Sequence, residues 1–359
     1  MRLKRLELWW RSQWIRILVR LMRRPAGSGK PDWAASPRRI LFLRHDRAGD
    51  MIVSTGVMRA IAKSHSTLTM DVLASPANAA VLDAADYVAD VIVFDKKRLK
   101  SYLPTLFRLR RAKYDAVIDC MVTAPSVTTL LLILASGARY RVGIAGRGND
   151  AAFNLTVPAE TRAKAHMVDF LAALAPAFGV DAGAVEKRPV LALTDAEGER
   201  AEAVWDHPRA LRRIVVNISA GTSERVWPEK NYVAVMRHIA EREPGAMLRV
   251  IASPSDAERA ERIARDGGGA FVRTASIRDA FALVATSDFV FTPDTSITHA
   301  ASAFRKPSVV LFTQGKAERW SLYGTPGANI EHADGTLATL GLDRVLHAVD
   351  EVLDHSVER

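Results

Sequence analysis

The chain has 359 residues, of which 48% are hydrophobic and 25% charged, and a chain of this length rarely shares one hydrophobic core. Its single cysteine, Cys120, excludes an internal disulfide, and no histidine or cysteine cluster has the spacing of zinc ligands. Most of the formal net charge of +10 lies in one short amphipathic segment, which lacks the aromatic stacking platform of a nucleic-acid-binding surface. We therefore predict no nucleic-acid partner.

Residues 1–24 are predicted to form a basic amphipathic helix, followed by a linker over 25–37. The helix holds eight lysines and arginines against one glutamate. Its apolar side chains recur at spacings of three and four and form one stripe, made of Leu3, Leu6, Trp10, Trp14, Ile17 and Leu21. A basic helix with tryptophans is typical of one that lies on an anionic membrane surface, and its arginines interrupt the apolar run too often for it to span. Packing of this helix on the body of the protein is the alternative.

Strands and helices then alternate twice along the chain. In the first half, apolar runs predict strands at 38–45, 67–75, 90–95, 114–121 and 141–146. Helices are expected between them at 56–65, 77–86 and 126–137. In the second half, strands are expected at 212–219, 246–253, 270–275, 288–293 and 307–314. The helices expected there are 230–243, 256–267, 277–287, 296–305 and 342–356.

This alternation is typical of βαβ units and a parallel sheet. It occurs twice, on either side of a polar, proline-containing stretch at 185–200. We predict an α/β protein of two Rossmann-like domains, over 38–185 and 186–359, that face a central cleft.

Neither half carries a GxGxxG after its first strand or a GxxxxGK[ST], which argues against a nicotinamide dehydrogenase and a P-loop ATPase. One other candidate for phosphate binding is "NISAGTSERVWPEKNY" at 217–232. After a strand it offers two hydroxyls, Thr222 and Ser223, and the cation of Arg225. Hydroxyls donate to phosphate oxygens, and an arginine grips phosphate with two hydrogen bonds. A capped loop with a solvated arginine is the alternative.

A second candidate for phosphate binding is "DFVFTPDTSITHAASAF" at 288–304. Asp294, Thr295 and Ser296 open a helix of small residues, with His299 in its first turn. The unpaired N–H groups and the dipole at such a helix start bind anions. Asp294 or Thr295 as a plain N-cap, with His299 packed rather than functional, is the alternative.

The stretch "RHDRAGDMIVSTGVMRAI" at 44–61 puts Asp46 and Asp50 where a strand turns into a helix. Open α/β sheets bind ligands at the carboxyl ends of their strands, so Asp50 is a candidate catalytic carboxylate. An Asp50 that only caps the helix is the alternative.

Three stretches, "ILFLRHDRAGDMIVSTGVMRAI", "AGTSERVWP" and "DTSITHAASAFRKPSVVLF", together resemble the heptosyltransferase family of lipopolysaccharide core synthesis. The resemblance spans residues 39 to about 325. It implies a GT-B fold that binds the acceptor mainly in the first domain and ADP-heptose in the second, with a C-terminal helix that crosses back. It implies that Asp50 is the catalytic base, that Arg225 replaces the family's lysine, and that Ser296 stands where the family has glycine. His299 matches the family's histidine.

The implied reaction is an inverting transfer to a lipid A-linked acceptor, in which Asp50 takes the proton of the attacking hydroxyl. The diphosphate of ADP-heptose, or of a related nucleotide sugar, would be bound by the second domain. The residues expected there are Thr222, Ser223, Arg225, Asp294, Thr295, Ser296 and His299, with Asp256 on the ribose hydroxyls or else capping a helix. No metal is required, although the resemblance leaves magnesium possible. The expected location is peripheral, on the cytoplasmic face of the membrane.

Three other functions remain open from the sequence. The chain could transfer a different activated sugar to capsule or another surface glycan. It could be a nucleotide-sugar epimerase on the same architecture. It could also be a non-catalytic, membrane-associated nucleotide-sugar-binding protein.

Overall fold

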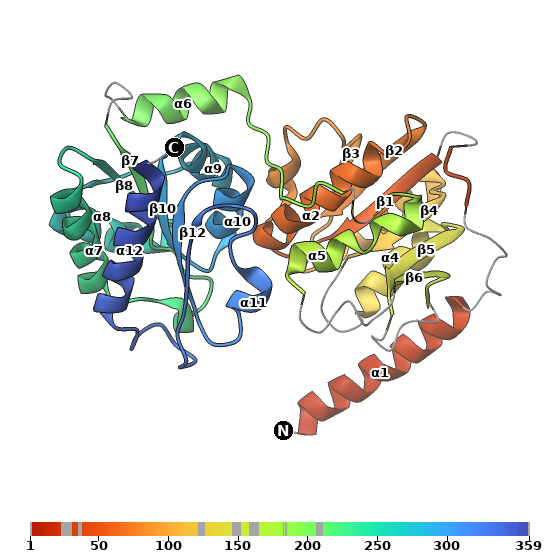
Figure 1. Ribbon diagram of the computed structural model, residues 1–359. Coiled ribbons are helices and arrows are strands. Elements are labelled where there is room, and N and C mark those ends of the chain that lie inside the picture. Colours follow the sequence, from red (N-terminus) through yellow and green to blue (C-terminus); the bar gives the residue numbers. More distant parts are fainter. Residues whose placement is uncertain are drawn as a thin grey trace. The chain divides into compact units, whose positions relative to one another are not determined.

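The computed structural model describes residues 2–22, 31–34, 38–120, 126–145, 152–157, 165–181, 183, 185–205 and 211–357. Within this part, the chain divides into two compact units, Met1–Lys187 and Arg188–Arg359 (Figure 1). Most of the predicted linker, residues 25–30 and 35–37, lies outside the described residues. Trp33, in the described part of that linker, is 3% exposed and stacks on Phe178 of the first unit with ring centroids 4.7 Å apart.

The first unit contains a six-stranded parallel sheet in the order β3-β2-β1-β4-β5-β6. Its strands are β1 (Arg38–Arg44), β2 (Leu68–Ala74), β3 (Asp90–Val93), β4 (Ala116–Asp119), β5 (Tyr140–Ile144) and β6 (Leu155–Val157). The strand order reverses between β1 and β4, which makes the carboxyl ends of these two strands the switch point where doubly wound sheets bind ligands. The sixth strand, β6, was not predicted.

The helices of the first unit are α1 (Arg2–Met22), α2 (Ala48–Ala62), α3 (Tyr102–Ala112), α4 (Val127–Ser136) and α5 (Met167–Ala172), with 3₁₀ turns η1 (Ala79–Leu82), η2 (Leu99–Ser101) and η5 (Ala175–Phe178). The predicted helix at 77–86 is wrong, because only η1 forms there. The amide of Asn78 bonds the backbone of Ser75 and of Arg44 and holds this stretch as a turn. The helix predicted at 56–65 begins earlier, at Ala48, so Asp50 lies inside it.

The second unit repeats this topology with a parallel sheet in the order β12-β11-β10-β7-β8-β9. Its strands are β7 (Arg213–Asn217), β8 (Met247–Ile251), β9 (Ala270–Phe271), β10 (Phe289–Pro293), β11 (Ser308–Phe312) and β12 (Gly327–Glu331). Here the strand order reverses between β7 and β10. The last strand, β12, was not predicted, and β9 is shorter than the predicted strand at 270–275.

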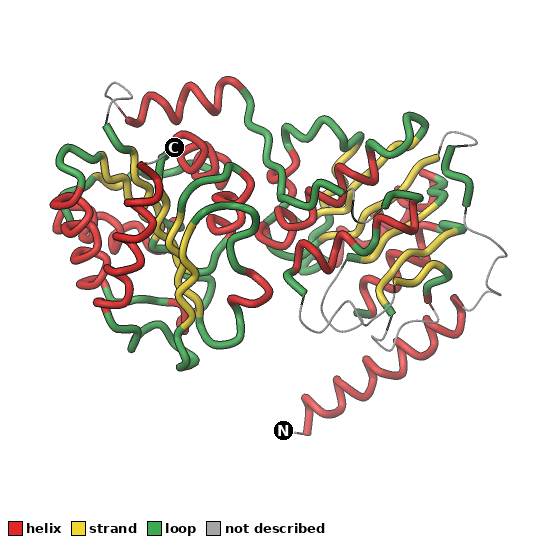
Figure 2. The backbone as a smooth tube through the Cα atoms, viewed as in Figure 1, coloured by secondary structure: helices red, strands yellow, loops and turns green. Residues whose placement is uncertain are grey.

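The helices of the second unit are α6 (Asp195–Trp205), α7 (Glu229–Arg242), α8 (Ala257–Asp266), α9 (Ile277–Thr286), α10 (Ser296–Ala303), α11 (Ala317–Trp320) and α12 (Leu342–Val357), with 3₁₀ turns η6 (Ser223–Arg225) and η7 (Pro254–Asp256). In each unit the helices pack around the strands (Figure 2). The polar stretch expected between the domains ends in α6, which a buried ion pair of Glu197 with Arg278 fastens to α9. The apolar side of α12 packs into the core of the second unit.

The helix α1 is partly packed and partly exposed. Leu18 and Met22, near its end, belong to the buried core of the first unit together with residues of α4, and the guanidinium of Arg141 donates a 2.8 Å hydrogen bond to the backbone oxygen of Met22. Trp9, Trp10 and Trp14 are about half exposed. The end of α1 is therefore anchored on the first unit, whereas its tryptophans face away from the core. Among the described residues, no helix is both long and apolar enough to cross a membrane.

Candidate active site

In the first unit, a buried arginine joins the end of β1 to the first turn of α2. Arg44 is the last residue of β1, and its side chain is 0% exposed. Its Nε donates a 2.9 Å hydrogen bond to the backbone oxygen of Asp50, and its Nη1 donates one of 2.6 Å to that of Cys120, just after β4. The same guanidinium lies 3.3 Å from Asp46 Oδ2 and 3.4 Å from Asp50 Oδ1. Both aspartates therefore lie at the switch point of the first sheet.

The two carboxylates share this one buried cation, and each side chain is 18% exposed. Burial raises the pKa of Asp50 above its usual range; Arg44 opposes this effect and the charge of Asp46 adds to it. Burial also raises the pKa of Asp46, against the effect of Arg44. The pair thus holds protons more tightly than exposed aspartates do, which suits a group that accepts a proton from a substrate.

Asp50 is the third residue of α2 and not its N-cap. The N-cap is Arg47, whose side chain makes no hydrogen bond to the helix. The backbone N–H of Arg47 does act on the Asp50 carboxylate and lowers its pKa, which is one half of a capping box. This one bond is consistent with a capping role for Asp50. Capping does not explain the contact of Asp50 with Arg44 or the raised pKa of Asp50.

The sequence analysis missed Arg44 and its neighbour His45. Burial is the main cause that lowers the pKa of His45 to about 4, so its imidazole is neutral at pH 7. The ring meets Phe94 edge-on, and Nε2 lies 3.5 Å from the hydroxyl of Thr129. One oxygen of Asp46, Oδ1, is buried without a hydrogen-bond partner in the described structure. The sequence signal that could have identified Arg44 is an arginine at the end of an apolar strand, two and six residues before the aspartates Asp46 and Asp50.

In the second unit, side chains at the switch point hold the loop after β7 against the start of α10. Asn217, the last residue of β7, donates from Nδ2 to the hydroxyl of Thr292 at 2.9 Å and to that of Thr295 at 3.0 Å. Thr295 is the N-cap of α10 and accepts a hydrogen bond from the N–H of Ile297. Asn217 is a further residue that the sequence analysis did not single out.

Arg225 fastens the loop after β7 to the same helix start. Its Nη1 donates a 2.7 Å hydrogen bond to the backbone oxygen of Asp294, and its Nη2 lies 2.9 Å from Asp294 Oδ2. The side chains of Arg225 and Asp294 are 17% and 7% exposed. The two predicted phosphate-binding stretches therefore meet, and they place a fixed cation beside the positive end of a helix.

The other residues of the two stretches lie around this contact. Thr222 and Ser223 are exposed at η6, before Arg225. Ser296 is the first residue of α10, and the only non-glycine residues with positive φ in the described structure are Lys113 and Arg305, so serine is unstrained there. His299 is 4% exposed, with its ring centroid 5.8 Å from that of Trp320.

Asp256 lies at the carboxyl end of the neighbouring strand β8. It precedes α8 as the N-cap residue, but its side chain makes no hydrogen bond to that helix. Its carboxylate instead accepts a 2.6 Å hydrogen bond from the hydroxyl of Ser253, whose N–H donates to Ser219 Oγ at 2.7 Å. Asp256 therefore does not cap α8 with its side chain. Its carboxylate lies near the carboxyl end of β8, where a ligand of the sheet is expected.

No group of three or more histidine, cysteine or acidic side chains within the described ranges is placed to hold a metal ion. The predicted site residues lie in two clusters, one in each unit. The first is Asp50 with Arg44 and Asp46 in the first unit. The second contains Arg225, Asp294 and Thr295 in the second unit, with Asp256 one strand away.

Residues 106–340 match the model of glycosyltransferase family 9 (heptosyltransferase). The chain belongs to this family. The matched range includes the cluster around Arg225 and begins after Asp50. No curated protein matches the chain.

Solved structures of the family share the fold. A glycosyl transferase family 9 structure from Veillonella parvula has a TM-score of 0.77 at 15% identity, over 89% of this chain and 98% of that one. E. coli ADP-heptose LPS heptosyltransferase II has a TM-score of 0.68 at 18% identity, and the match covers 88% of this chain and 99% of that one. E. coli heptosyltransferase WaaC with ADP has a TM-score of 0.70 at 16% identity, and the match covers 88% of this chain and 99% of that one.

The predicted GT-B fold, with two Rossmann-like domains, is confirmed by these matches and by the two parallel sheets. The family match also confirms the predicted enzyme class, a heptosyltransferase-like glycosyltransferase. It favours transfer over the nucleotide-sugar epimerase and over the non-catalytic binding protein that the sequence left open.

Proposed function

We propose that this family 9 enzyme transfers heptose from ADP-heptose to a lipid A-linked acceptor of the lipopolysaccharide inner core, with inversion at the anomeric carbon. The observation that carries the proposal is the contact of Arg225 with Asp294 at the start of α10. It joins two anion-binding features at the switch point of one sheet, inside the range that matches the family model. The resemblance of the three sequence motifs to heptosyltransferases supports heptose as the sugar.

In the proposed reaction, a hydroxyl of the acceptor attacks the anomeric carbon, the bond from that carbon to the diphosphate breaks, and ADP leaves. Asp50 takes the hydroxyl proton, for which its raised pKa is suited. Arg44 holds the carboxylates of Asp46 and Asp50 in place, through its contacts to both and to the backbone after β4. Arg44 therefore acts as a positioning residue.

The second unit is proposed to bind the donor. Arg225 and the N–H group of Ser296 meet the charge that develops on the departing diphosphate, and the N–H of Thr295 donates to the hydroxyl of Thr298 and so fixes this helix start. The exposed hydroxyls of Thr222 and Ser223 add donors. Asp256 is proposed to accept from the ribose hydroxyls, since it lies at the carboxyl end of β8 without capping α8. His299, buried against Trp320, packs behind the helix start.

Residues 1–24 are proposed to hold the enzyme at the cytoplasmic face of the membrane, where a lipid-linked acceptor presents its sugars. The exposed tryptophans of α1 support this, because interfacial helices bury such side chains among lipid headgroups. The packed end of α1 on the first unit provides the anchor.

The test is product analysis with purified full-length enzyme, ADP-heptose and a lipid A-linked inner-core acceptor. We expect an acceptor heavier by one heptose and stoichiometric ADP, with and without a metal chelator. ADP is expected to raise the melting temperature more than UDP or GDP, since a ligand stabilises the state that it binds. Transfer from a different nucleotide sugar alone would support the capsule or surface-glycan alternative. An isomerised nucleotide sugar formed without acceptor would contradict the proposal.

A further inference from the structure

A second basic and apolar segment follows β3, in the part of the chain outside residues 1–24. Residues 96–113 carry eight lysines and arginines and no acidic residue. Residues 99–112 of this segment form η2 and α3 in the structure. Leu99, Leu103 and Phe107 of this segment are 86%, 66% and 68% exposed. No described residue covers these three large apolar side chains, and exposed apolar side chains that lie close together on one element mark a site of interaction.

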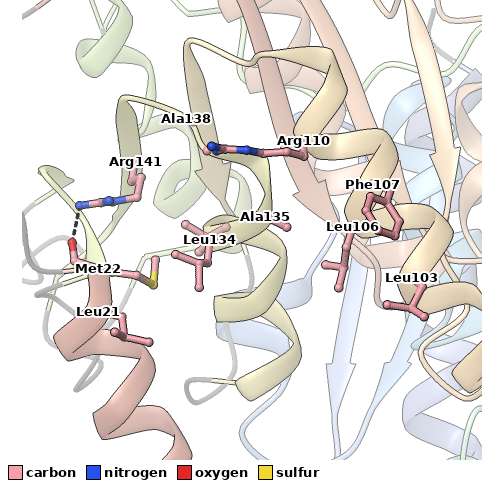
Figure 3. Close-up of a pocket in the computed structure, with 12 residues that line it drawn as sticks. Leu21, Met22, Leu103, Leu106, Phe107, Arg110, Leu134, Ala135, Ala138 and Arg141 are labelled. Carbon is pink, nitrogen blue, oxygen red and sulfur yellow. Dashed lines mark hydrogen bonds between the residues drawn. The ribbon is translucent and has the colours of Figure 1, made fainter.

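The exposed apolar face of α3 continues onto α1. Leu103 and Phe107 of α3 and Leu21 of α1 line one groove of about 570 Å³, whose floor is formed by α4. Figure 3 shows that the labelled side chains come from the end of α1, from α3, from α4 and from the segment after it, with Ala138 between α4 and β5 and Arg141 in β5. Leu21 is 67% exposed, and Ile17 and Trp14 extend the apolar stripe along α1. The groove thus connects two amphipathic helices into one apolar surface.

Cations surround this surface. Arg110 lines the groove itself, next to Gly137 at the end of α4. Arg98 and Arg108 pair with Asp95 and Asp90. For the other cations of the segment, which are Lys96, Lys97, Lys100, Arg110, Arg111 and Lys113, the described residues contain no ion-pair partner. Positive charge in excess of its acidic neighbours, beside an apolar face, complements an anionic lipid surface and repels a second copy of itself.

We propose that η2 and α3 form a second membrane-contacting element, which binds an anionic bilayer together with α1. Leu99, Leu103 and Phe107 enter the interfacial region of the bilayer, and the cations of 97–113 that make no ion pair in the described structure meet the anionic headgroups. A peripheral protein with two such elements is held more firmly and in a more defined orientation than one with a single helix, because binding through one element raises the local concentration of the second at the membrane. This inference rests on the proposed function, from which it takes the membrane as the binding partner. The experiment distinguishes a failure of membrane binding by α3 from a failure of membrane binding by residues 1–24.

The experiment is flotation of the full-length protein with vesicles of phosphatidylcholine containing about 30% phosphatidylglycerol, at an ionic strength of about 0.1 M. Leu103→Gln/Phe107→Gln removes apolar contact without charge, at two sites exposed enough to keep the fold. We expect its partition onto vesicles to fall about tenfold or more, while its melting temperature and its response to ADP stay those of the wild type. Lys97→Glu/Lys100→Glu tests the charges, and Arg237→Glu/Arg265→Glu on the exposed faces of α7 and α8 is the matched control.

Wild-type partition of Leu103→Gln/Phe107→Gln would overturn the inference. If Trp9→Gln/Trp14→Gln alone abolishes flotation while that variant floats normally, residues 1–24 bind the membrane without α3. Equal losses in the charge-reversed variant and in its matched control would show a general charge effect and also overturn the inference. A wild type that forms dimers which Leu103→Gln/Phe107→Gln dissociates, with unchanged flotation, would show that the surface is a contact between copies of the chain.

Discussion

At the scale of single residues, the central feature is a fully buried arginine between two carboxylates. Burial by itself would lower the pKa of Arg44, but the charges of Asp46 and Asp50 keep it above its ordinary value. One cation cannot offset the desolvation of two carboxylates, so both aspartate pKa values are raised. Such a cluster is costly for stability, and costly buried charges are common where they serve a reaction.

We predict that Asp50→Asn lowers turnover by about 10²–10⁴-fold, the usual contribution of a general base, and leaves ADP affinity unchanged. It should not lower stability at neutral pH, because the raised pKa means that ionised Asp50 opposes folding. Steady-state kinetics and melting curves measure both. Asp50 as a plain cap predicts instead a loss of stability of about 0.5–2 kcal/mol with turnover kept.

Asp46→Asn is the informative companion, since Asp46 has the same exposure and the same cation. We expect it to keep more activity than Asp50→Asn. Loss of transfer in Asp46→Asn with full activity in Asp50→Asn would move the base to Asp46, whose Oδ1 lacks a partner in the described structure. Asp86→Asn, at an exposed surface ion pair, is the neutral control.

The pH dependence follows from the same shift. The base acts in its ionised form, so kcat/KM should rise with pH through a value clearly above the ordinary aspartate pKa of about 3.9. The pKa read from this rise of kcat/KM belongs to the Asp46–Asp50 pair as a whole, because the two carboxylates interact. For stability the sign is opposite, because the raised pKa stabilises the fold below the unfolded pKa and this stabilisation is lost as pH rises through the folded pKa. Asp50→Asn should therefore gain stability relative to the wild type above about pH 4, and a constant difference across pH would contradict this.

Arg225→Ala tests the donor cluster. We predict that it weakens ADP binding by about 1.5–3 kcal/mol, the range for hydrogen bonds to charged groups. Calorimetric titration with ADP measures the change. Arg265→Ala, an exposed arginine of α8 in the same unit, should bind ADP like the wild type. Equal affinities for Arg225→Ala and the wild type would remove Arg225 from the site.

At the scale of elements, a local cap and a distant side chain together fix the start of α10, where we propose that the diphosphate binds. Its N-terminus is closed by the box of Thr295 with Thr298, and the hydroxyl of Thr295 also accepts from Asn217 of β7. The cap thus keeps the helix start at the end of the neighbouring strand. Ser296 follows with ordinary helical backbone, so the glycine that the family has at this position is not required by φ.

We predict that Ser296→Gly restores the family residue at a small cost, about 0.5 kcal/mol of stability, because glycine is the poorer helix former. ADP affinity should not change, since the backbone N–H is retained. Denaturant unfolding and ADP titration check the two quantities. A large gain in ADP affinity on this change would show that the serine side chain obstructs the donor site.

At the scale of the whole molecule, each unit repeats the same doubly wound sheet and carries one part of the proposed chemistry. The first unit holds the acid pair, and the second holds the proposed anion site. We predict that saturating ADP slows amide hydrogen exchange at 217–226 and 293–300 and leaves 40–60 unchanged, because a bound ligand protects the site that holds it. Protection confined to 40–60 would place the nucleotide in the first unit instead.

Much of the fold could be predicted because its signals are local. Apolar runs and helical spacing lie within a few residues of one another, so they revealed most strands, most helices and their alternation. The errors occur where a local signal is weak or is overruled. At 77–86 the apolar spacing suits a helix, but the buried amide of Asn78 holds a turn. The unpredicted β6 has only three residues, too few to give a periodic pattern, and the strand predicted at 270–275 ends early, at Phe271.

The sequence by itself determined the family resemblance, the two parallel sheets and the candidates Asp50, Arg225 and Asp294, because motif residues sit at fixed offsets from strand ends. Only the tertiary structure showed Arg44 beneath both aspartates, Asn217 against Thr295 and the exposed apolar face of α3. Arg44 meets a backbone oxygen 76 residues away, and Arg225 meets Asp294 across 69 residues. Which strand ends become neighbours depends on the sheet order, and which apolar side chains stay in water depends on what packs over them. Neither the sheet order nor the packing over an apolar side chain can be predicted from a local stretch of sequence.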